Sequence, residues 1–287
     1  MRRRRARGGG RRREAGFALL IVLWSLAALS LLATQITGEG RAGVREAASL
    51  SDSAVLEAGA DGAVHAALFH LISNSRDHWA PDGQVHPVRL PGGVVDVALF
   101  DEAGKLDVNE AAPAVLRALF QGLGADAQAA ETAAESISDW HSPSDIALPM
   151  GGKAPRYRSE GRRYGPPGQP LETLDELKLV RGMTPALFAR VLPYLTMHLE
   201  QMPERALAAP VVVAALDQAM RTDKVPIAEP DARGPAVVRI VAVARGAGGA
   251  AFTRRALVRL DGSLIGSPWR YRILAWGSGE DAAGLLF

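Results

Sequence analysis

The apolar residues of the chain form one continuous stretch near the N-terminus and periodic patterns further on. No charged residue occurs between Ala15 and Gly38, and the apolar core of this stretch runs from Phe17 to Ala33. The 17 residues of that core would span about 25 Å as a helix, and their neutral neighbours extend it toward the ~30 Å hydrocarbon thickness of a bilayer. A helix in a soluble core would show a polar stripe over this length, and none is present. The pattern therefore predicts a membrane-spanning helix.

Residues 41–75 stay rich in Ala, Leu, Glu and Arg, with apolar positions at helical spacing. They are predicted to form the second half of one long N-terminal helix. Glycines weaken this prediction by up to about 1 kcal/mol each, so bends are expected. The glycines concerned are Gly38, Gly40, Gly43, Gly59 and Gly62.

The remainder alternates between strand and helix patterns. Residues 80–93 are punctuated by Pro and Gly, and the alternation of residues 94–100 predicts a strand. Helical segments are predicted within 111–140, interrupted at 122–124, and at 174–181 and 184–192, with the Pro- and Gly-rich residues 141–170 as a loop. The similar segments AAPAVLRALFQ (111–121) and AAPVVVAALDQ (208–218) each place Pro in a first helical turn. An antiparallel meander is predicted for 237–243, 253–260 and 269–276.

The predicted helices thus lie between the strand at 94–100 and the C-terminal strands. Helices inserted between parts of one sheet indicate an α+β fold.

The positive charge of the chain is concentrated at its N-terminus. Residues 1–16 contain eight arginines and one glutamate, and without them the chain has 25 basic and 30 acidic side chains, a net charge of −5. Arginines before the apolar stretch place the N-terminus in the cytoplasm and the body across the membrane. A weakly acidic body gives no general reason to expect nucleic acid. The absence of cysteine excludes disulfides and thiolate chemistry.

Two kinds of processed leader fit a basic segment followed by an apolar one. A secretory signal peptide needs small residues at a cleavage site, but the apolar run continues into Thr34-Gln35-Ile36-Thr37 without a clear A-x-A pattern. The order of arginines, Glu14-Ala15-Gly16 and an apolar segment opening at Phe17 resembles the leader of type IV prepilins. That resemblance implies cleavage after Gly16 by a prepilin peptidase and N-methylation of Phe17.

The fifth residue after the expected cleavage site departs from the major pilins. They carry a glutamate there, proposed to pair with the N-terminal amine of the neighbouring subunit, and this chain has Ile21. A carboxylate in hydrocarbon costs about 2.5–3.5 kcal/mol on insertion scales and so needs a function. A subunit at the tip of a filament has no such neighbour above it, so Ile21 is typical of a tip subunit.

Several segments together resemble the type II secretion system protein K family, the GspK-type minor pseudopilins. They are GFALLIVLWSLAALSLLA (16–33), DEAGKLDVNEAAP (101–113), Ile137-Ser138-Asp139-Trp140 and TLDELKLVRGMTPALFARVLPYLT (173–196). The resemblance implies a pilin-like long N-terminal helix packed on a small antiparallel sheet, with a large helical domain inserted. The expected divisions are a leader (1–16), a long helix (17–75), first strands (76–110), an inserted α-helical domain (111–222) and C-terminal strands (223–287).

The same resemblance implies a structural role. Such a subunit caps the periplasmic pseudopilus together with minor pseudopilins I and J, contacts the inner-membrane assembly platform, and supports export of folded proteins across the outer membrane. It is a single-pass inner-membrane protein and not an enzyme. In keeping with this, the sequence contains no G-x-S-x-G elbow, phosphate loop or H-E-x-x-H spacing.

The resemblance also implies calcium in the loop after Asp139-Trp140. Calcium takes about six to eight oxygen ligands, often carboxylates, and Asp139 and Asp145 are the candidates here, with backbone carbonyls completing the shell. Lys153 stands where the family has an acidic residue, and its positive charge opposes calcium.

A membrane-anchored helix-hairpin-helix DNA receptor is the alternative. Gly122-Leu123-Gly124 and Val180-Arg181-Gly182-Met183-Thr184 each lie between two predicted helices, where backbone amides could bind a phosphate. Residues 122–140 contain four acidic residues and no Lys or Arg, however, which is the opposite of what phosphate binding requires.

Overall fold

The computed structural model describes residues 11–73, 76–199, 201–225, 236–261 and 270–279. Within the first helix it describes the side chains of residue 17, residues 19–31 and those from 46 onward. Residues 1–10 of the predicted leader and Trp269 of the last predicted strand lie outside these ranges. Contacts divide the chain into two units, residues 1–55 and 56–287.

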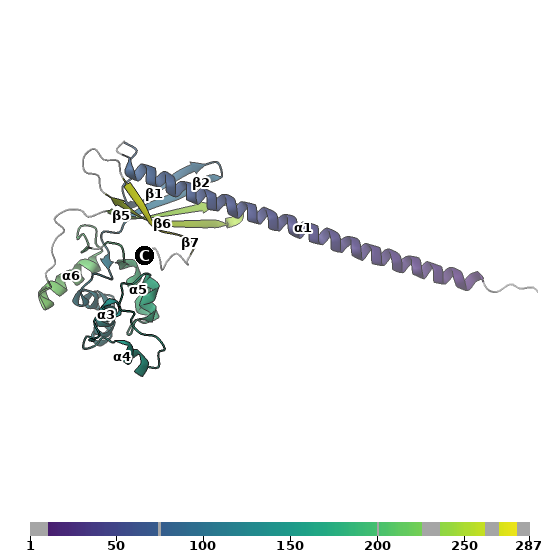
Figure 1. Cartoon of the computed structure of the whole chain (residues 1–287). Helices are drawn as coiled ribbons and strands as arrows, with labels where there is room; N and C mark the ends of the chain where they lie inside the picture. Colours follow the sequence, from purple (N-terminus) through teal and green to yellow (C-terminus); the bar gives the residue numbers. More distant parts are fainter. Residues whose placement is uncertain (1–10, 74–75, 200, 226–235, 262–269, 280–287) are drawn as a thin grey trace, which may run out of the picture. The chain divides into compact units, whose positions relative to one another are not determined.

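The elements follow one another as helix, two strands, a helical block and three strands (Figure 1). In chain order they are α1 (Arg11–Ile72), β1 (Asp82–Leu90), β2 (Gly93–Asp101), β3 (Leu106–Asp107), α2 (Pro113–Gly122), α3 (Ala127–His141), α4 (Ala154–Ser159), the 3-10 helix η1 (Leu174–Leu179), α5 (Pro185–Val191), η2 (Leu192–Tyr194), β4 (Leu195–Thr196), α6 (Pro210–Asp223), β5 (Ala236–Arg245), η3 (Ala247–Gly249), β6 (Ala251–Asp261) and β7 (Arg270–Ser278).

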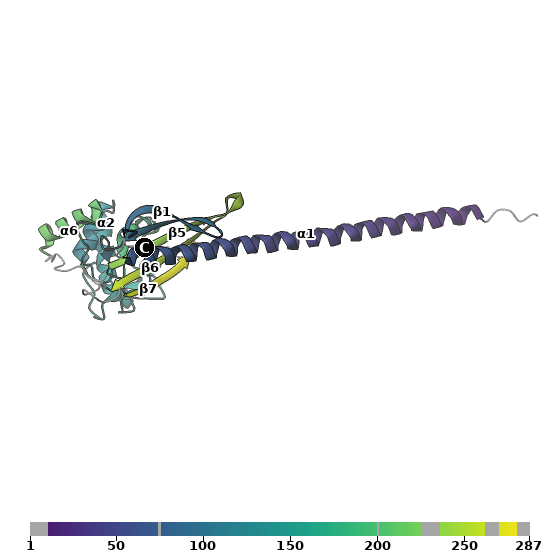
Figure 2. The same cartoon turned by 90° about the horizontal axis from the view of Figure 1, so that it is seen from above.

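Helix α1 is drawn as one continuous helix in Figure 2, and its range of Arg11–Ile72 includes all five glycines. Two of these glycines face the sheet. A Cβ on Gly59 would lie 3.6 Å from Val95 Cγ2, and one on Gly62 would lie 3.5 Å from Leu90 Cδ1. A Cβ at either position would make an ordinary van der Waals contact, and packing of this part of α1 on the strands offsets the low helix propensity of glycine.

Five strands form one antiparallel sheet in the order β1-β2-β5-β6-β7. Alternate residues of β2 and β5, among them Val97, Leu99 and Ile240, are buried against the C-terminal part of α1. Strand β1 lies in the stretch that the sequence presented only as punctuated by Pro and Gly. It is an edge strand, where the missing N–H of Pro87 is tolerated, and Gly83 provides the positive φ of +82° at a shift in register.

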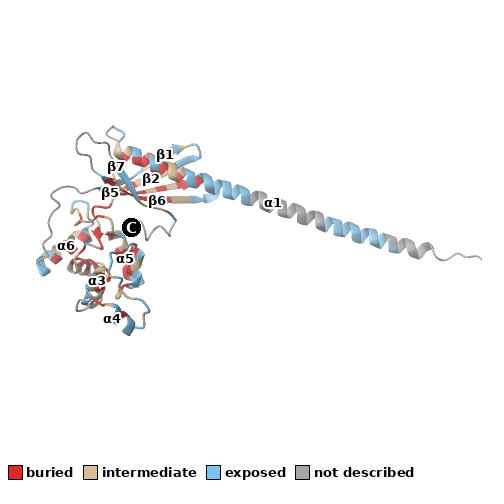
Figure 3. Cartoon of the chain, viewed as in Figure 1, coloured by how far each residue is buried: buried red, intermediate tan, exposed pale blue. Residues whose placement is uncertain are grey.

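The helical block is inserted between β2 and β5, which are neighbours in the sheet. It has its own buried core, formed by α2, α3, α5, α6 and the intervening segments (Figure 3). Both α2 and α6 begin with a proline in the first turn, Pro113 and Pro210, as the repeated segment predicts. The segment predicted as a helix over 174–181 is the 3-10 helix η1, opened by a capping box of Thr173 and Glu176. The predicted α+β fold class is confirmed.

Long-range polar contacts tie this block to the sheet. The buried carboxylate of Glu102, just after β2, pairs with Lys105 at 2.8 Å and with Arg239 of β5 at 3.0 Å. The Asp107 carboxylate accepts a hydrogen bond of 2.9 Å from the backbone N–H of Leu199. Leu199 in turn packs on Val237 and so covers the side of β5 that points away from α1.

Candidate functional site

The first part of α1 exposes its apolar side chains. Phe17 is 69% exposed and Ile21 is 54% exposed. The other large apolar residues described in this segment are exposed as well, namely Leu19, Leu20, Val22, Leu23, Trp24, Leu26, Leu29 and Leu31. Contiguous apolar exposure of this kind marks a surface that meets a membrane or another protein.

Length and composition alone select a different part of α1. Among the described residues, Glu46–Ile72 is the one helical stretch long and apolar enough to cross a membrane, and Leu19–Leu31 is a shorter apolar segment. The apolar residues of the former are largely accounted for, because Val64, Leu68 and Leu71 are buried against the sheet. The latter continues without charge to Gly38 in the sequence. The exposed segment is therefore the better candidate for a membrane anchor.

The expected processing site lies inside α1. The backbone is helical through Gly16 and Phe17, so the bond to be cut is part of a continuous helix in the uncleaved chain. Cleavage after Gly16 and methylation of Phe17 stay predictions.

The loop after α3 contains the predicted calcium candidates. Asp139 is buried near the end of α3, and both of its carboxylate oxygens accept from the backbone N–H of Leu148, at 3.1 and 3.3 Å. One turn earlier, Glu135 Oε2 accepts from the N–H groups of Met150, at 2.5 Å, and Gly151, at 3.1 Å. Both carboxylates are therefore used in holding the returning loop.

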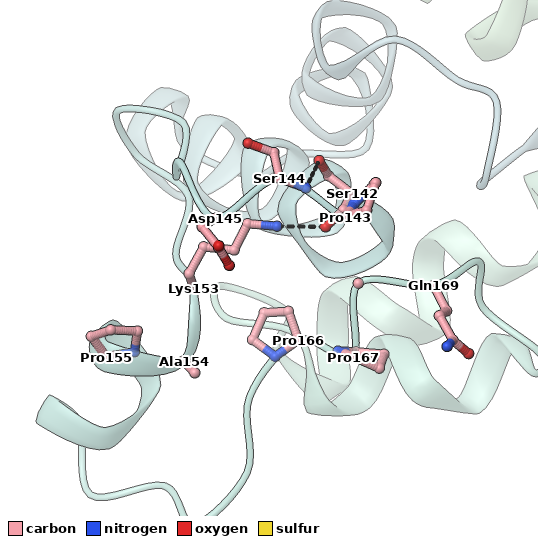
Figure 4. Close-up of a pocket in the computed structure, with 11 residues that line it drawn as sticks. Ser142, Pro143, Ser144, Asp145, Lys153, Ala154, Pro155, Pro166, Pro167 and Gln169 are labelled. Carbon is pink, nitrogen blue, oxygen red and sulfur yellow. Dashed lines mark hydrogen bonds between the residues drawn. The ribbon is translucent and has the colours of Figure 1, made fainter.

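The Lys153 side chain directs its ammonium group at the C-terminal end of α3. Its Nζ donates to the carbonyl oxygens of Asp139 at 2.6 Å and Ser142 at 2.7 Å. A surface pocket of about 520 Å³ lies beside this loop and is lined by Ser142, Lys153 and several prolines (Figure 4). Asp145 is exposed and also lines this pocket. The structure thus places Asp139 and Asp145 on one loop but gives them different surroundings.

Further contacts of Arg181, which follows η1, fix the far end of the loop. Arg181 donates from Nη1 to the Met150 carbonyl at 2.6 Å and pairs through Nε with Glu160 at 2.6 Å, which lowers the pKa of the Glu160 carboxyl. The Arg181 N–H donates to the hydroxyl of Tyr157, whose pKa burial raises to about 12. A Cβ on Gly151 would lie 2.2 Å from Asp139 Oδ2, so only glycine fits there.

The oxygen atoms around this loop do not fit a calcium site. Calcium needs about six to eight oxygens converging on one point. Here the carboxylates of Asp139, which is buried, and Glu135, which is partly buried, accept from N–H groups, and the carbonyls of Asp139 and Ser142 accept from an ammonium group. Over the described parts of the chain, no group of three or more His, Cys, Asp or Glu side chains is arranged to hold a metal ion. The roles of Glu135 and Arg181 were missed from the sequence, since each depends on a fold-back of 15 residues or more.

In the two hairpins of the DNA-binding alternative, backbone N–H groups or the basic side chain already have partners within the chain. At the first, the N–H groups of Leu123, Gly124 and Ala125 donate to carbonyls at the end of α2. At the second, Met183 N–H donates to Val180, and Arg181 pairs with Glu160. The amides of the first hairpin are thus engaged within the chain, and the basic side chain of the second is paired with a carboxylate, which leaves it less available for a phosphate.

Comparison with known proteins supports the resemblance to protein K that the sequence segments indicate. Residues 95–200 match the family model described as "Type II secretion system (T2SS), protein K". The type II secretion system protein K of Klebsiella pneumoniae is 28% identical over 204 residues, which are 63% of this chain and 62% of that protein. The chain is therefore similar to the type II secretion system protein K family, as its sequence segments predict.

The fold of the chain also resembles a solved structure. A chain in the crystal structure of the GspK-GspI-GspJ complex from the enterotoxigenic Escherichia coli type 2 secretion system matches with a TM-score of 0.59 at 18% identity. The match covers 82% of this chain and 99% of that chain. The chain spans about three fifths (62%) of the length of the Klebsiella pneumoniae protein. The sequence-based family prediction is confirmed.

Proposed function

We propose that this chain is a minor pseudopilin that caps the tip of the periplasmic pseudopilus of a type II secretion system. It is held in the inner membrane by residues 17–38, with the N-terminus cytoplasmic and the body periplasmic. In this role it has no catalytic activity, and it acts through contacts with other subunits to support export of folded proteins.

One observation carries the proposal. The chain combines an apolar helix segment, exposed at Phe17 and from Leu19 to Leu31, with a body whose residues 95–200 match protein K. Helix α1 includes this apolar segment, and its C-terminal part packs on the sheet of the body. An anchor continuous with a folded head is the arrangement that a filament subunit requires.

The proposed partners are the minor pseudopilins I and J, the prepilin peptidase and the assembly platform. The structural relative comes from a complex of GspK with GspI and GspJ, which supports the first two. Ile21 supports the tip position, because an uncharged side chain forgoes the pairing with a subunit above it.

The proposal is tested by co-expressing the tagged full chain with the I and J subunits of its own system and with prepilin peptidase. A peptidase-dependent N-terminus at Phe17 and co-purification of both subunits are expected. Processing without co-purification would refute the assignment of partners, and an unprocessed chain would refute the pseudopilin assignment itself.

The tip position has its own test. Ile21→Glu supplies the charge that the major pilins carry, and it is not expected to improve pseudopilus assembly. The readout is the amount of pseudopilus, measured in parallel with Val22→Glu as a control for simply placing a carboxylate in the anchor. Clear improvement specific to Ile21→Glu would contradict the tip position.

A further inference from the structure

The C-terminal end of α3 is closed by groups from the chain itself. The last carbonyls of an α-helix have no partner within the helix, and this end carries partial negative charge. Here Ser142 N–H donates to the Ser138 carbonyl at 3.1 Å, and Gly168 N–H donates to the Trp140 carbonyl at 3.0 Å. Lys153 satisfies the carbonyls of Asp139 and Ser142. A full positive charge therefore lies at the negative end of the helix.

The carboxylates of the last two turns of α3 point at backbone donors. Asp139 binds the N–H of Leu148, and Glu135 binds those of Met150 and Gly151. Hydrogen bonds from N–H groups to carboxylates are stronger than neutral ones, because the acceptor is ionised. The loop from 142 to 153 is thus fastened on one side through its amides and on the other through the Lys153 ammonium.

Charged groups of both signs already contact this loop. Two carboxylates, Glu135 and Asp139, bind the loop, and two cations, Lys153 and Arg181, bind its carbonyls or those next to it. A divalent cation placed at the carbonyls of Asp139 and Ser142 would displace an ammonium group that makes two bonds shorter than 2.8 Å. It would also have to draw the carboxylates away from the amides that they hold.

From these contacts we infer that Lys153 is a built-in cation that replaces a metal ion in ordering the 142–153 loop. The loop of this chain keeps its structure without calcium, because the Lys153 ammonium acts as the cation beside the carboxylates that hold the loop amides. The inference concerns the loop alone and stands whether or not the chain caps a pseudopilus.

Hydrogen–deuterium exchange of the full chain in detergent micelles tests the inference. The probe is calcium chloride, compared with the chelator EGTA and with magnesium chloride. In the wild-type chain, the exchange rate of peptides covering 147–152 is expected to be the same in calcium, magnesium and EGTA, because the contacts that order the loop do not require a metal ion. Slower exchange of these peptides in calcium than in EGTA would overturn the inference.

A variant removes the ammonium while keeping the length of the side chain. Lys153→Met is expected to speed exchange of the 147–152 peptides at least tenfold, a loss of about 1.4 kcal/mol, whereas peptides of β5 and β6 stay unchanged. Lys178→Met is the matched control, since Lys178 belongs to the same helical block but makes an exposed ion pair with Asp175. Equal exchange in Lys153→Met and wild type would overturn the inference. The comparison of calcium with EGTA needs no variant, so it decides the matter even if Lys153→Met fails to fold.

Discussion

Arg254 of β6 is the polar link between the sheet and α1, and its surroundings allow a quantitative prediction. It pairs across the strand with Ala242, on the face that α1 covers, and its side chain is only 8% exposed. Its Nε donates to Asp61 at 2.5 Å and its Nη2 to Glu57 at 2.6 Å, both on α1. The guanidinium also lies 5.4 Å from the ring centroid of Trp276.

Burial differs sharply between the cation and its partners, and this sets the expected magnitudes. Glu57 is 54% exposed and Asp61 is 35% exposed, so either carboxylate alone is partly screened by water. Glu57→Ala is expected to lower the free energy of unfolding by less than about 1 kcal/mol, and Asp61→Ala by about 1 kcal/mol. Removing both leaves a buried charge without a counter-ion, which costs about 3–5 kcal/mol. The loss in the double variant therefore exceeds the sum of the single losses.

A third substitution distinguishes this reasoning from a general loss of contacts. Adding Arg254→Met to the double variant removes the uncompensated charge, so the triple variant is expected to be more stable than the double. The assay is urea unfolding of the full chain in detergent micelles, followed by circular dichroism and by tryptophan fluorescence, to which Trp276 contributes. Additive losses in the double variant, or a triple variant less stable than the double, would refute the reasoning.

Three further changes have defined outcomes. Gly16→Val is expected to block leader removal by prepilin peptidase, and an unchanged mass of the membrane-bound chain would contradict the cleavage site. Gly104→Ala is expected to lower the free energy of unfolding by about 2–3 kcal/mol in the same urea assay, because its Cβ would lie 2.2 Å from the carbonyl oxygen of Leu207; an unchanged midpoint would contradict this. Burial lowers the pKa of both His141 and His198 below the usual 6.5, so the unfolded chain binds more protons and stability falls as pH drops through about 6.5. Urea midpoints that stay flat between about pH 7.5 and 5.5 in His141→Gln/His198→Gln but fall in wild type would confirm these histidines as the source.

Local patterns predicted the elements whose causes are local. Alternation gave the strands around Val97 and Ile240, and Pro in a first turn gave the starts of α2 and α6. First strands were expected within 76–110, but the local pattern did not place β1, because Pro87 is compatible with a strand only at a sheet edge, and edge position is a property of the assembled sheet. The glycines of α1 were expected to bend the helix, and their close contact with Val95 and Leu90 became visible only in the fold.

Lys153 shows where sequence reasoning about a site ends. A basic residue at an expected ligand position identifies what is lost, a carboxylate, and so predicts weaker calcium binding. It cannot identify what is gained, because the partners of the ammonium are the backbone carbonyls of Asp139 and Ser142, and carbonyls have no signature in a sequence. The helix end supplies these acceptors whatever its side chains are. A lysine able to reach a helix C-terminus can therefore substitute for a cation without any change in the residues that present the oxygens.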